Sequence, residues 1–198
     1  MTIAELLVHD TELDQFIEVM DHRLPSIDAV EEKITALHES FYFLLSKDFI
    51  PREYKKDIPG IFAQYLLYRN AERNLSLMAM VVPPKISTPI HNHLAWGLVG
   101  VYQGTQREIV YETIGEPDLE HNQAQLRTIS ENILEIGDIT TLEPPHNDIH
   151  MIETISEEPS ISLHLLGNDI GCQARHAFDQ ESNSVRQFTS GYVNAECN

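Results

Sequence analysis

The feature that most constrains the fold is a change of hydrophobic period about sixty residues into the chain. The clearest early stripe of apolar residues repeats at 3.6-residue spacing, which is the pattern of an amphipathic helix. Its members are Val30, Ile34, Leu37, Phe41, Leu44 and Leu45. From Ile61 onward, short β-rich runs are separated by turn residues every eight to twelve positions. That spacing is typical of an antiparallel sandwich or barrel.

These patterns predict a helical start followed by an eight-strand antiparallel barrel or jelly roll. We expect a helix from about Ile3 to Met20 and a second one that begins near a capping box of Asp28 and Glu31. A connecting loop covers Lys47 to Ile58. Strands are expected near residues 62–69, 75–82, 95–102, 107–114, 125–136, 148–155, 160–166 and 172–178. Because a domain averages roughly 150 residues, we interpret 1–198 as one domain, with a helical segment at 1–58 and a barrel at 60–193.

The composition excludes several classes of function. With 13 basic and 31 acidic residues the net charge is −18, which repels nucleic-acid backbones and anionic membrane surfaces. The longest apolar run, Leu94 to Tyr102, is nine residues, too short to span a bilayer. The first residues lack the basic and apolar regions of a signal peptide. Two cysteines, Cys172 and Cys197, are too few for a disulfide framework, which fits a reducing compartment and predicts a cytoplasmic location.

The histidines are the candidate site residues. His91 and His93 alternate with Asn92, so on a strand their side chains point to the same side and can chelate a metal. Two surface histidines that happen to alternate would show the same spacing. His150 is the better third ligand because a strand is expected to begin near Asp148, whereas His146 follows two prolines, as is typical of a solvated turn.

The two histidine segments resemble the motifs of the cupins, which are double-stranded β-helix proteins with a metal in the barrel. The first motif matches His91-Asn92-His93, and the second matches Pro145 to His150, with Asn147 at the usual glycine position. Most cupins carry a glutamate four residues after the second histidine, and here that position is Gly97. The resemblance therefore implies a mainly β cupin barrel with an N-terminal helical segment and three neutral imidazole ligands: His91, His93 and His150.

Among three-histidine cupins, the chain is similar to the thiol dioxygenases, of the cysteine and 3-mercaptopropionate dioxygenase type. The similar segments extend over roughly 12–193 and are Gln64–Leu67, Thr88–His93, Trp96–Leu98, Ser160–His164 and Ser190–Tyr192. This resemblance implies an iron(II) cofactor, O₂ and a small thiol acid as reactants, and a sulfinate product. Coordination chemistry fits this reaction. Three imidazoles on one face of an octahedral iron leave about three open positions, and a soft substrate thiolate suits one of them.

The same resemblance assigns roles to several residues. Ser162 and His164 match the catalytic pair beside the iron, but the accompanying family tyrosine is replaced by Leu166. Arg175 matches the substrate-binding arginine of the mercaptopropionate-type enzymes. Gln64 stands where cysteine-specific members carry their arginine, and Trp96 lies in a further similar segment, so both are expected to bind substrate.

Two other classes of function remain open for this sequence. A three-histidine cupin oxygenase that cleaves a carbon–carbon bond in a diketone-like chelate needs the same ligands and no tyrosine. A non-catalytic metal-binding cupin would also keep the histidines. For Arg175, an ordinary surface arginine in an acidic protein is the alternative interpretation, and for His164 it is a hydrogen-bonded core histidine.

Overall fold

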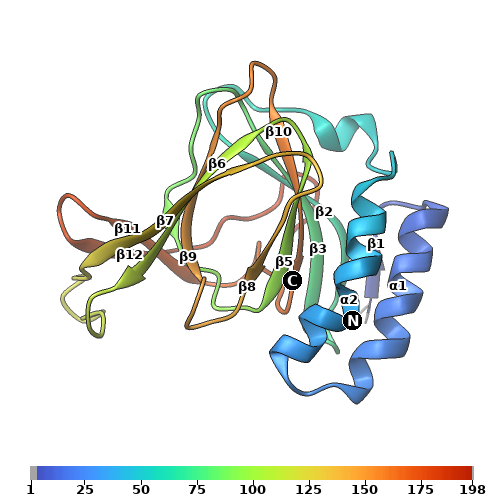
Figure 1. Ribbon diagram of the computed structural model, residues 1–198, viewed down its shortest axis with the longest axis horizontal. Helices are drawn as coiled ribbons and strands as arrows, with labels where there is room; N and C mark the ends of the chain where they lie inside the picture. The colour runs from blue at the N-terminus through green and yellow to red at the C-terminus, as the bar shows by residue number, and fades with distance from the viewer. Residues whose placement is uncertain (1–3, 198) are drawn as a thin grey trace.

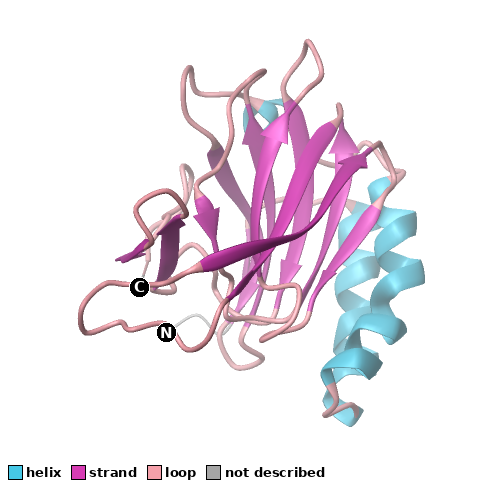
Figure 2. Ribbon diagram, turned by 60° about the vertical axis from the view of Figure 1, so that its left-hand side comes forward, coloured by secondary structure: helices cyan, strands magenta, loops and turns pink. Residues whose placement is uncertain are grey.

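The computed structural model describes residues 4–197, which form two antiparallel sheets and a layer of helices. The helices are α1 (Thr11–Arg23) and α2 (Val30–Leu45), with short 3₁₀ turns η1 (Leu24–Ser26) and η2 (Arg52–Lys55) after them. Both long helices lie against the outer face of one sheet (Figures 1 and 2). Among the described residues, no helix has the length and apolar character needed to cross a membrane.

The strands form two six-stranded sheets that face each other. The helix-covered sheet has the order β1 (Ala4–Leu6), β2 (Ala63–Asn70), β3 (Leu75–Val82), β10 (Ser160–Leu166), β5 (Gly97–Gln103) and β8 (Ile139–Leu142). The second sheet has the order β12 (Ser184–Phe188), β11 (Arg175–Asp179), β4 (Ile90–His91), β9 (Ile149–Thr154), β6 (Gln106–Thr113) and β7 (Leu126–Leu134). The fold is mainly β, a double-stranded β-helix jelly roll with an N-terminal helical segment, as the sequence predicts.

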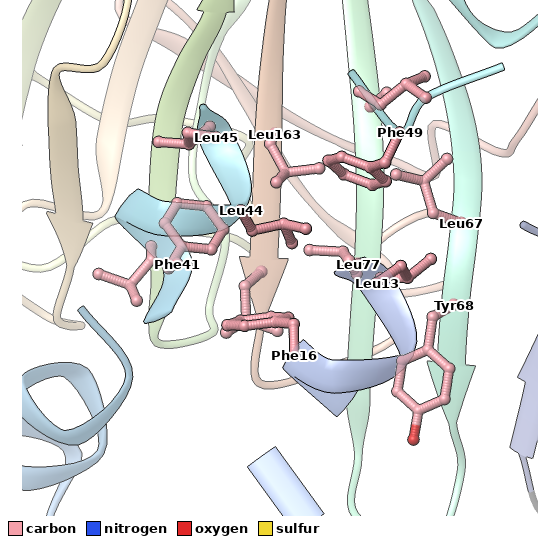
Figure 3. Close-up of a cluster of buried hydrophobic side chains, with 14 of the residues drawn as sticks. Leu13, Phe16, Phe41, Leu44, Leu45, Phe49, Leu67, Tyr68, Leu77 and Leu163 are labelled. Atoms are coloured by element: carbon pink, nitrogen blue, oxygen red, sulfur yellow. The ribbon is translucent and has the colours of Figure 1, made fainter. Parts of the chain in front are cut away.

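The main hydrophobic core lies between the helices and the helix-covered sheet, not inside the barrel. Apolar residues from α1 and α2 pack there against outward-facing residues of β2, β3 and β10 (Figure 3). On β10, the strand alternation sends Ile161, Leu163 and Leu165 into this core. Ser162 and His164 therefore point into the barrel. Gly100 lets α2 approach closely, since a Cβ built there would be 2.3 Å from Leu45 Cδ1.

The N-terminal elements differ in part from the expectation. The apolar stripe of α2 is confirmed, with Ile34, Leu37 and Phe41 buried. The helix expected from Ile3 begins only at Thr11, because the Asp10 carboxylate accepts hydrogen bonds from the Glu12 and Leu13 amides; Ile3 itself lies outside the described residues. The preceding residues form β1, which pairs antiparallel with β2. The expected capping box is wrong: the N-cap of α2 is Ala29, which makes no side-chain cap bond.

The barrel contains more strands than the eight expected. Eight of the observed strands lie at the expected places, within a few residues at their ends, but β1, β4, β8 and β12 are additional. These four strands are short, between two and five residues. A strand this short shows too little alternation to be recognised, and it is stabilised by its neighbours in the sheet.

The two cysteines are paired, a point that their number alone leaves open. Cys172, before β11, forms a disulfide with Cys197 near the end of the chain, with 5.3 Å between the two Cα atoms. The low cysteine count argued correctly against a framework of several bridges. It carried no information about whether the chain folds back to bring these two residues together.

Candidate metal centre

Three buried histidines meet inside the barrel. His91 ends β4 and His150 lies in β9, and antiparallel pairing of the two strands sets these residues directly opposite each other. His93 follows two residues after His91. The ring centroids are 4.9 Å apart for His91 and His93, 5.0 Å for His91 and His150, and 4.8 Å for His93 and His150. One nitrogen from each ring lies within 4.8 Å of the others, so the group can hold a metal ion.

Each ring is oriented by a hydrogen bond at Nδ1. His91 Nδ1 donates to the Pro89 carbonyl (2.9 Å), and His93 Nδ1 donates to the Asp148 carbonyl (3.1 Å). His150 Nδ1 donates to Glu108 Oε1 (2.8 Å). With the proton on Nδ1 the lone pair is on Nε2, and Nε2 of His150 is buried with no hydrogen-bond partner. The donor set therefore fits a divalent metal.

The electrostatic environment keeps the first two rings neutral. Burial, together with the charges of Arg175 and His150, holds the pKa of His91 well below its ordinary value. Burial and the neighbouring histidines do the same to the pKa of His93. Neutral imidazole is the form that binds a metal. At pH 7 these ligands need no deprotonation before a metal binds.

Glu108 is a part of the site that the sequence analysis missed. It lies on β6, is 3% exposed, and also accepts a hydrogen bond from Asn132 Nδ2 (3.4 Å). Burial raises its pKa, but the hydrogen bond and charge of His150, with the bond from Asn132, outweigh burial, and the net pKa is below the ordinary value. The carboxylate is therefore ionised behind the third histidine. Its only sequence signal is a polar residue at an inward position of β6, two residues after buried Gln106.

The position of the usual cupin glutamate has no room for a side chain. A Cβ built on Gly97 would be 2.5 Å from Leu166 Cδ2 and 2.7 Å from the Leu165 carbonyl oxygen. Leu166 is fully buried in an apolar cluster with Met78 and Val99. The barrel therefore has an apolar floor where the resemblance would put a carboxylate and a phenol, and Glu108 supplies a carboxylate from the other sheet.

Ser162 and His164 form a buried pair inside the barrel. The Ser162 hydroxyl and His164 Nε2 are 2.9 Å apart, and Gln106 Nε2 donates to the same hydroxyl at 3.4 Å. The second ring nitrogen of His164, Nδ1, is buried with no partner. Burial and the charges of His150 and Arg175 lower the pKa of His164 to about 3. This ring is neutral at physiological pH and serves as a hydrogen-bonding group rather than a base.

Arg175 is a buried cation that forms no salt bridge within 4 Å among the described residues, although the charge of Asp148 acts on it and, against the larger effect of burial, raises its pKa. It is 2% exposed, donates from NH1 to the Asn92 carbonyl (3.2 Å) and from NH2 to Ser190 Oγ (2.9 Å), and has no partner at Nε. Its Cζ lies 4.7 Å from the centroid of the Phe188 ring. Burial lowers the pKa of Arg175 to about 10, so the guanidinium is charged at pH 7.

A cavity of about 10 Å³, room for about one water molecule, lies between this guanidinium and one of the three histidines, His91. Arg175, His91 and Phe188 line it together with Gln64, whose Oε1 is buried without a hydrogen-bond partner. Unpartnered buried polar groups are costly in a folded protein, and they mark places where a ligand completes the hydrogen bonding. The combination of a free guanidinium N–H and a glutamine amide suits a small anion.

A larger cavity reaches the cluster from the other side. It has a volume of about 290 Å³ and is lined by polar residues of β6, β7 and β8, with His150 and Glu108 in its wall. Its walls contain Asn132 and Thr141 but no lysine or arginine. Of the three clustered histidines, only His150 lines it.

Two of the remaining predicted residues lie elsewhere. Trp96, expected to bind substrate, packs against the helix-side core and the backbone at Gly167, on the opposite face of the sheet from the histidines. The alternation of β5 explains this correction, because the residues that follow Trp96 at even numbers also face the helices. His146, the other candidate for third ligand, is exposed in a turn and stays outside the cluster.

The choice of third ligand can be tested by metal content. The variant His150→Ala should lose the bound metal, because two imidazoles cannot hold it, whereas His146→Ala should retain it. Elemental analysis of purified protein after metal loading measures both. Loss of metal in His146→Ala alone would show that the loop rearranges and that His146 is the ligand.

The contribution of Glu108 to the metal site can be measured as metal affinity, without an activity assay. Glu108→Ala removes the acceptor that orients His150 and should weaken Co²⁺ binding about 10- to 100-fold, whereas Glu108→Gln keeps an acceptor and should lose less. Calorimetric titration of the metal-free protein with Co²⁺ measures the affinity. Glu131→Gln, on the exposed face of β7, is the matched control. Equal affinities in all four proteins would mean that Glu108 does not support the metal centre.

His164 should make the free energy of unfolding depend on pH. Its pKa is about 3 in the folded chain but about 6.5 when unfolded. Below pH 6.5 only the unfolded state takes up the proton, so stability is fully present above pH 6.5 and falls as the pH falls toward 3. This histidine should cost about 2 kcal/mol between pH 7 and pH 5.

Urea unfolding of the metal-free protein at several pH values measures this dependence. His164→Gln should reduce the loss of stability between pH 7 and pH 5, and His38→Gln, an exposed position on α2, should not. The same pH dependence in wild type and His164→Gln would contradict the assignment of a buried neutral ring.

Comparison with known proteins gives a low-level similarity of fold. No protein-family model matches the chain. A protein of Klebsiella pneumoniae with a double-stranded β-helix domain is 16% identical, with a TM-score of 0.43 over 61% of this chain and 84% of its own. A cupin superfamily protein of Desulfitobacterium hafniense is 12% identical, with a TM-score of 0.39 over 58% and 84%. A DMSP lyase of Ruegeria pomeroyi is 17% identical, with a TM-score of 0.39 over 69% and 64%.

Proposed function

We propose that the protein is an iron(II)-dependent dioxygenase that oxidises a small thiol carboxylic acid, of the 3-mercaptopropionate kind, to its sulfinate. One observation carries the proposal: a cluster of three histidines lies beside a buried guanidinium that forms no salt bridge among the described residues and has an unpartnered Nε. A metal-chelating group and an anion-binding group share the small cavity through His91 and Arg175. A substrate with a thiolate at one end and a carboxylate at the other satisfies both.

Arg175 and Gln64 would hold the carboxylate. Two existing hydrogen bonds hold the guanidinium of Arg175 in one orientation, and it has further N–H groups free to donate. The arginine side chain therefore loses little conformational entropy when a carboxylate binds. The stacked Phe188 ring excludes water from one face of the guanidinium and strengthens its interaction with an anion. Because Gln64 is neutral where an arginine would add a second charge, the pocket suits one carboxylate.

Iron bound by His91, His93 and His150 would supply the oxygen chemistry and bind the thiolate sulfur. The overall reaction is RSH + O₂ → RSO₂H, so both oxygen atoms enter the product and no external reductant is consumed. Ser162 and His164 would contribute hydrogen bonds at the reacting end of the substrate, since the hydroxyl and the neutral ring lie inside the barrel. The absent phenol at Leu166 leaves this pair without a third partner there.

Oxygen uptake is the direct test. Iron-loaded protein should consume O₂ with 3-mercaptopropionate, and far less with 1-propanethiol, which lacks the carboxylate. Arg175→Ala should lower kcat/KM for the acid by roughly 30- to 1,000-fold, equivalent to about 2–4 kcal/mol, because the carboxylate loses a charged partner. It should change the slow reaction with propanethiol little. Arg186→Ala, an exposed arginine on β12, is the control.

The other outcomes identify the alternatives. Uptake with 2,4-pentanedione but with no thiol would support carbon–carbon cleavage instead. A protein that binds iron and consumes no O₂ with either class of compound would be a non-catalytic metal-binding protein. If Arg175→Ala lowered kcat/KM equally for the acid and for propanethiol, Arg175 would not bind the substrate carboxylate.

A further inference from the structure

The last ten described residues lie folded back against the barrel. We call Phe188–Cys197 the C-terminal strap; it is the red end of the chain in Figure 1. The Val193 amide donates to the Gln64 carbonyl (2.9 Å). The Asn194 side chain accepts from the Leu66 amide (2.8 Å) and donates to the Leu66 carbonyl (2.9 Å). The strap thus runs beside β2 and pairs with its backbone.

The beginning of the strap contacts the guanidinium of Arg175. Ser190 Oγ accepts a hydrogen bond from NH2 at 2.9 Å, and the Phe188 ring stacks on the same group. The only other side-chain hydrogen bond of Arg175 within the described residues goes to the Asn92 carbonyl. The strap therefore provides most of what holds the buried cation in one orientation.

The strap also fixes the turn that precedes Arg175. The Gly191 amide donates to the Gly171 carbonyl (2.8 Å), and the Gly171 amide donates to the Tyr192 hydroxyl (2.9 Å). That hydroxyl in turn donates to Asp169 Oδ1 (2.7 Å). A Cβ at Gly171 would be 2.3 Å from the Tyr192 ring, so the two segments are in direct contact.

The disulfide closes this arrangement into a covalent loop. Cys172 lies three residues before Arg175, and Cys197 ends the described strap, 25 residues later in the chain. The loop contains the arginine, β11, β12 and the whole strap. Cys197 is exposed, so a reductant can reach the bond. A cross-link across a segment of this length limits how far the segment can move away when its hydrogen bonds open.

We propose that the C-terminal strap positions Arg175 for binding a small anion, with Ser190 as a positioning residue, and that the Cys172–Cys197 disulfide locks the strap. A dithiol reductant opens the bond by exchange: the dithiol is oxidised to its own disulfide, and Cys172 and Cys197 take up its two electrons and two protons as thiols. The strap then detaches more readily, the guanidinium loses its fixed direction, and anion affinity falls. The inference rests on the proposed function in one respect, that the anion is the carboxylate of the substrate.

The first experiment tests the strap without any ligand. Hydrogen exchange followed by mass spectrometry should show faster exchange of the Leu66 and Val193 amides in Cys197→Ser than in wild type. Treating wild type with the neutral tris(hydroxypropyl)phosphine should give the same change, since the phosphine takes up the oxygen of water and reduces the disulfide. The same phosphine treatment should not change the exchange rates in Cys197→Ser, which has no disulfide to reduce. Unchanged exchange in both reduced forms would overturn the locking role of the disulfide.

The second experiment measures anion binding to iron-loaded protein under anaerobic conditions. The probe is 3-(methylthio)propionate, which keeps the carboxylate and the sulfur but cannot reduce a disulfide. Cys197→Ser and Ser190→Ala should each raise its Kd about 5- to 10-fold, because a guanidinium without a fixed direction keeps its charge but binds the anion with poorer geometry. Ser182→Ala, an exposed serine in the β11–β12 turn, should leave the Kd unchanged.

The outcomes separate this inference from the proposed function. If wild type binds the probe and Ser190→Ala and Cys197→Ser bind it equally well, the strap does not position Arg175 and the inference is wrong. If wild type and Arg175→Ala bind the probe with the same affinity, the anion site of the proposed function is wrong. In that case the exchange experiment still decides whether the disulfide locks the strap.

Discussion

The structure depends on the burial of the helix-covered sheet on both of its faces. Strand β3 is buried at all eight positions, and β10 at all seven. The outward residues of these strands pack on α1 and α2, which provides the main apolar core of the domain. Because this core lies outside the barrel, the inward positions are free to carry polar groups. Without the helices, the outer face of this sheet would be a large exposed apolar surface.

The polar interior is stabilised by hydrogen bonds wherever the protein provides partners. The Gln106 and Thr154 side chains both bond to Ser160 Oγ, and Asp148 accepts a hydrogen bond from the His93 amide. Among the described residues, four of the seven buried side-chain atoms without a partner belong to the candidate site: Gln64 Oε1, His150 Nε2, His164 Nδ1 and Arg175 Nε. Each of these atoms has a cost in the folded state that a bound ion or ligand would remove. Strained or unsatisfied groups that gather in one place are a mark of function.

Local signals in the sequence predict the parts of this protein that depend on short-range order. The 3.6-residue stripe from Ile34 to Leu45 corresponds to α2, and the alternation of Ser162 and His164 with leucines predicts that both face the same side of β10. The helix expected near Ile3 is wrong because an apolar stripe does not locate the N-cap at Asp10. Trp96 is misplaced for a different reason. Its role came from a similar segment, and that similarity carried no information about which face of the sheet the ring occupies.

By itself, the sequence predicted the fold class, placed His91 and His93 on one side with two surface histidines as the alternative, and favoured His150 over His146 as the third ligand. Period and spacing are properties of the chain, so they can be read from it. The tertiary structure decided that Glu108 from another strand orients His150, and that Arg175 lies buried with no salt bridge to any residue from 4 to 197. It also decided that the end of the chain returns to Cys172 and contacts that arginine. These contacts join residues 15 to 83 positions apart in the chain. They exist only once the sheets have formed, because strand pairing and core packing bring such residues together.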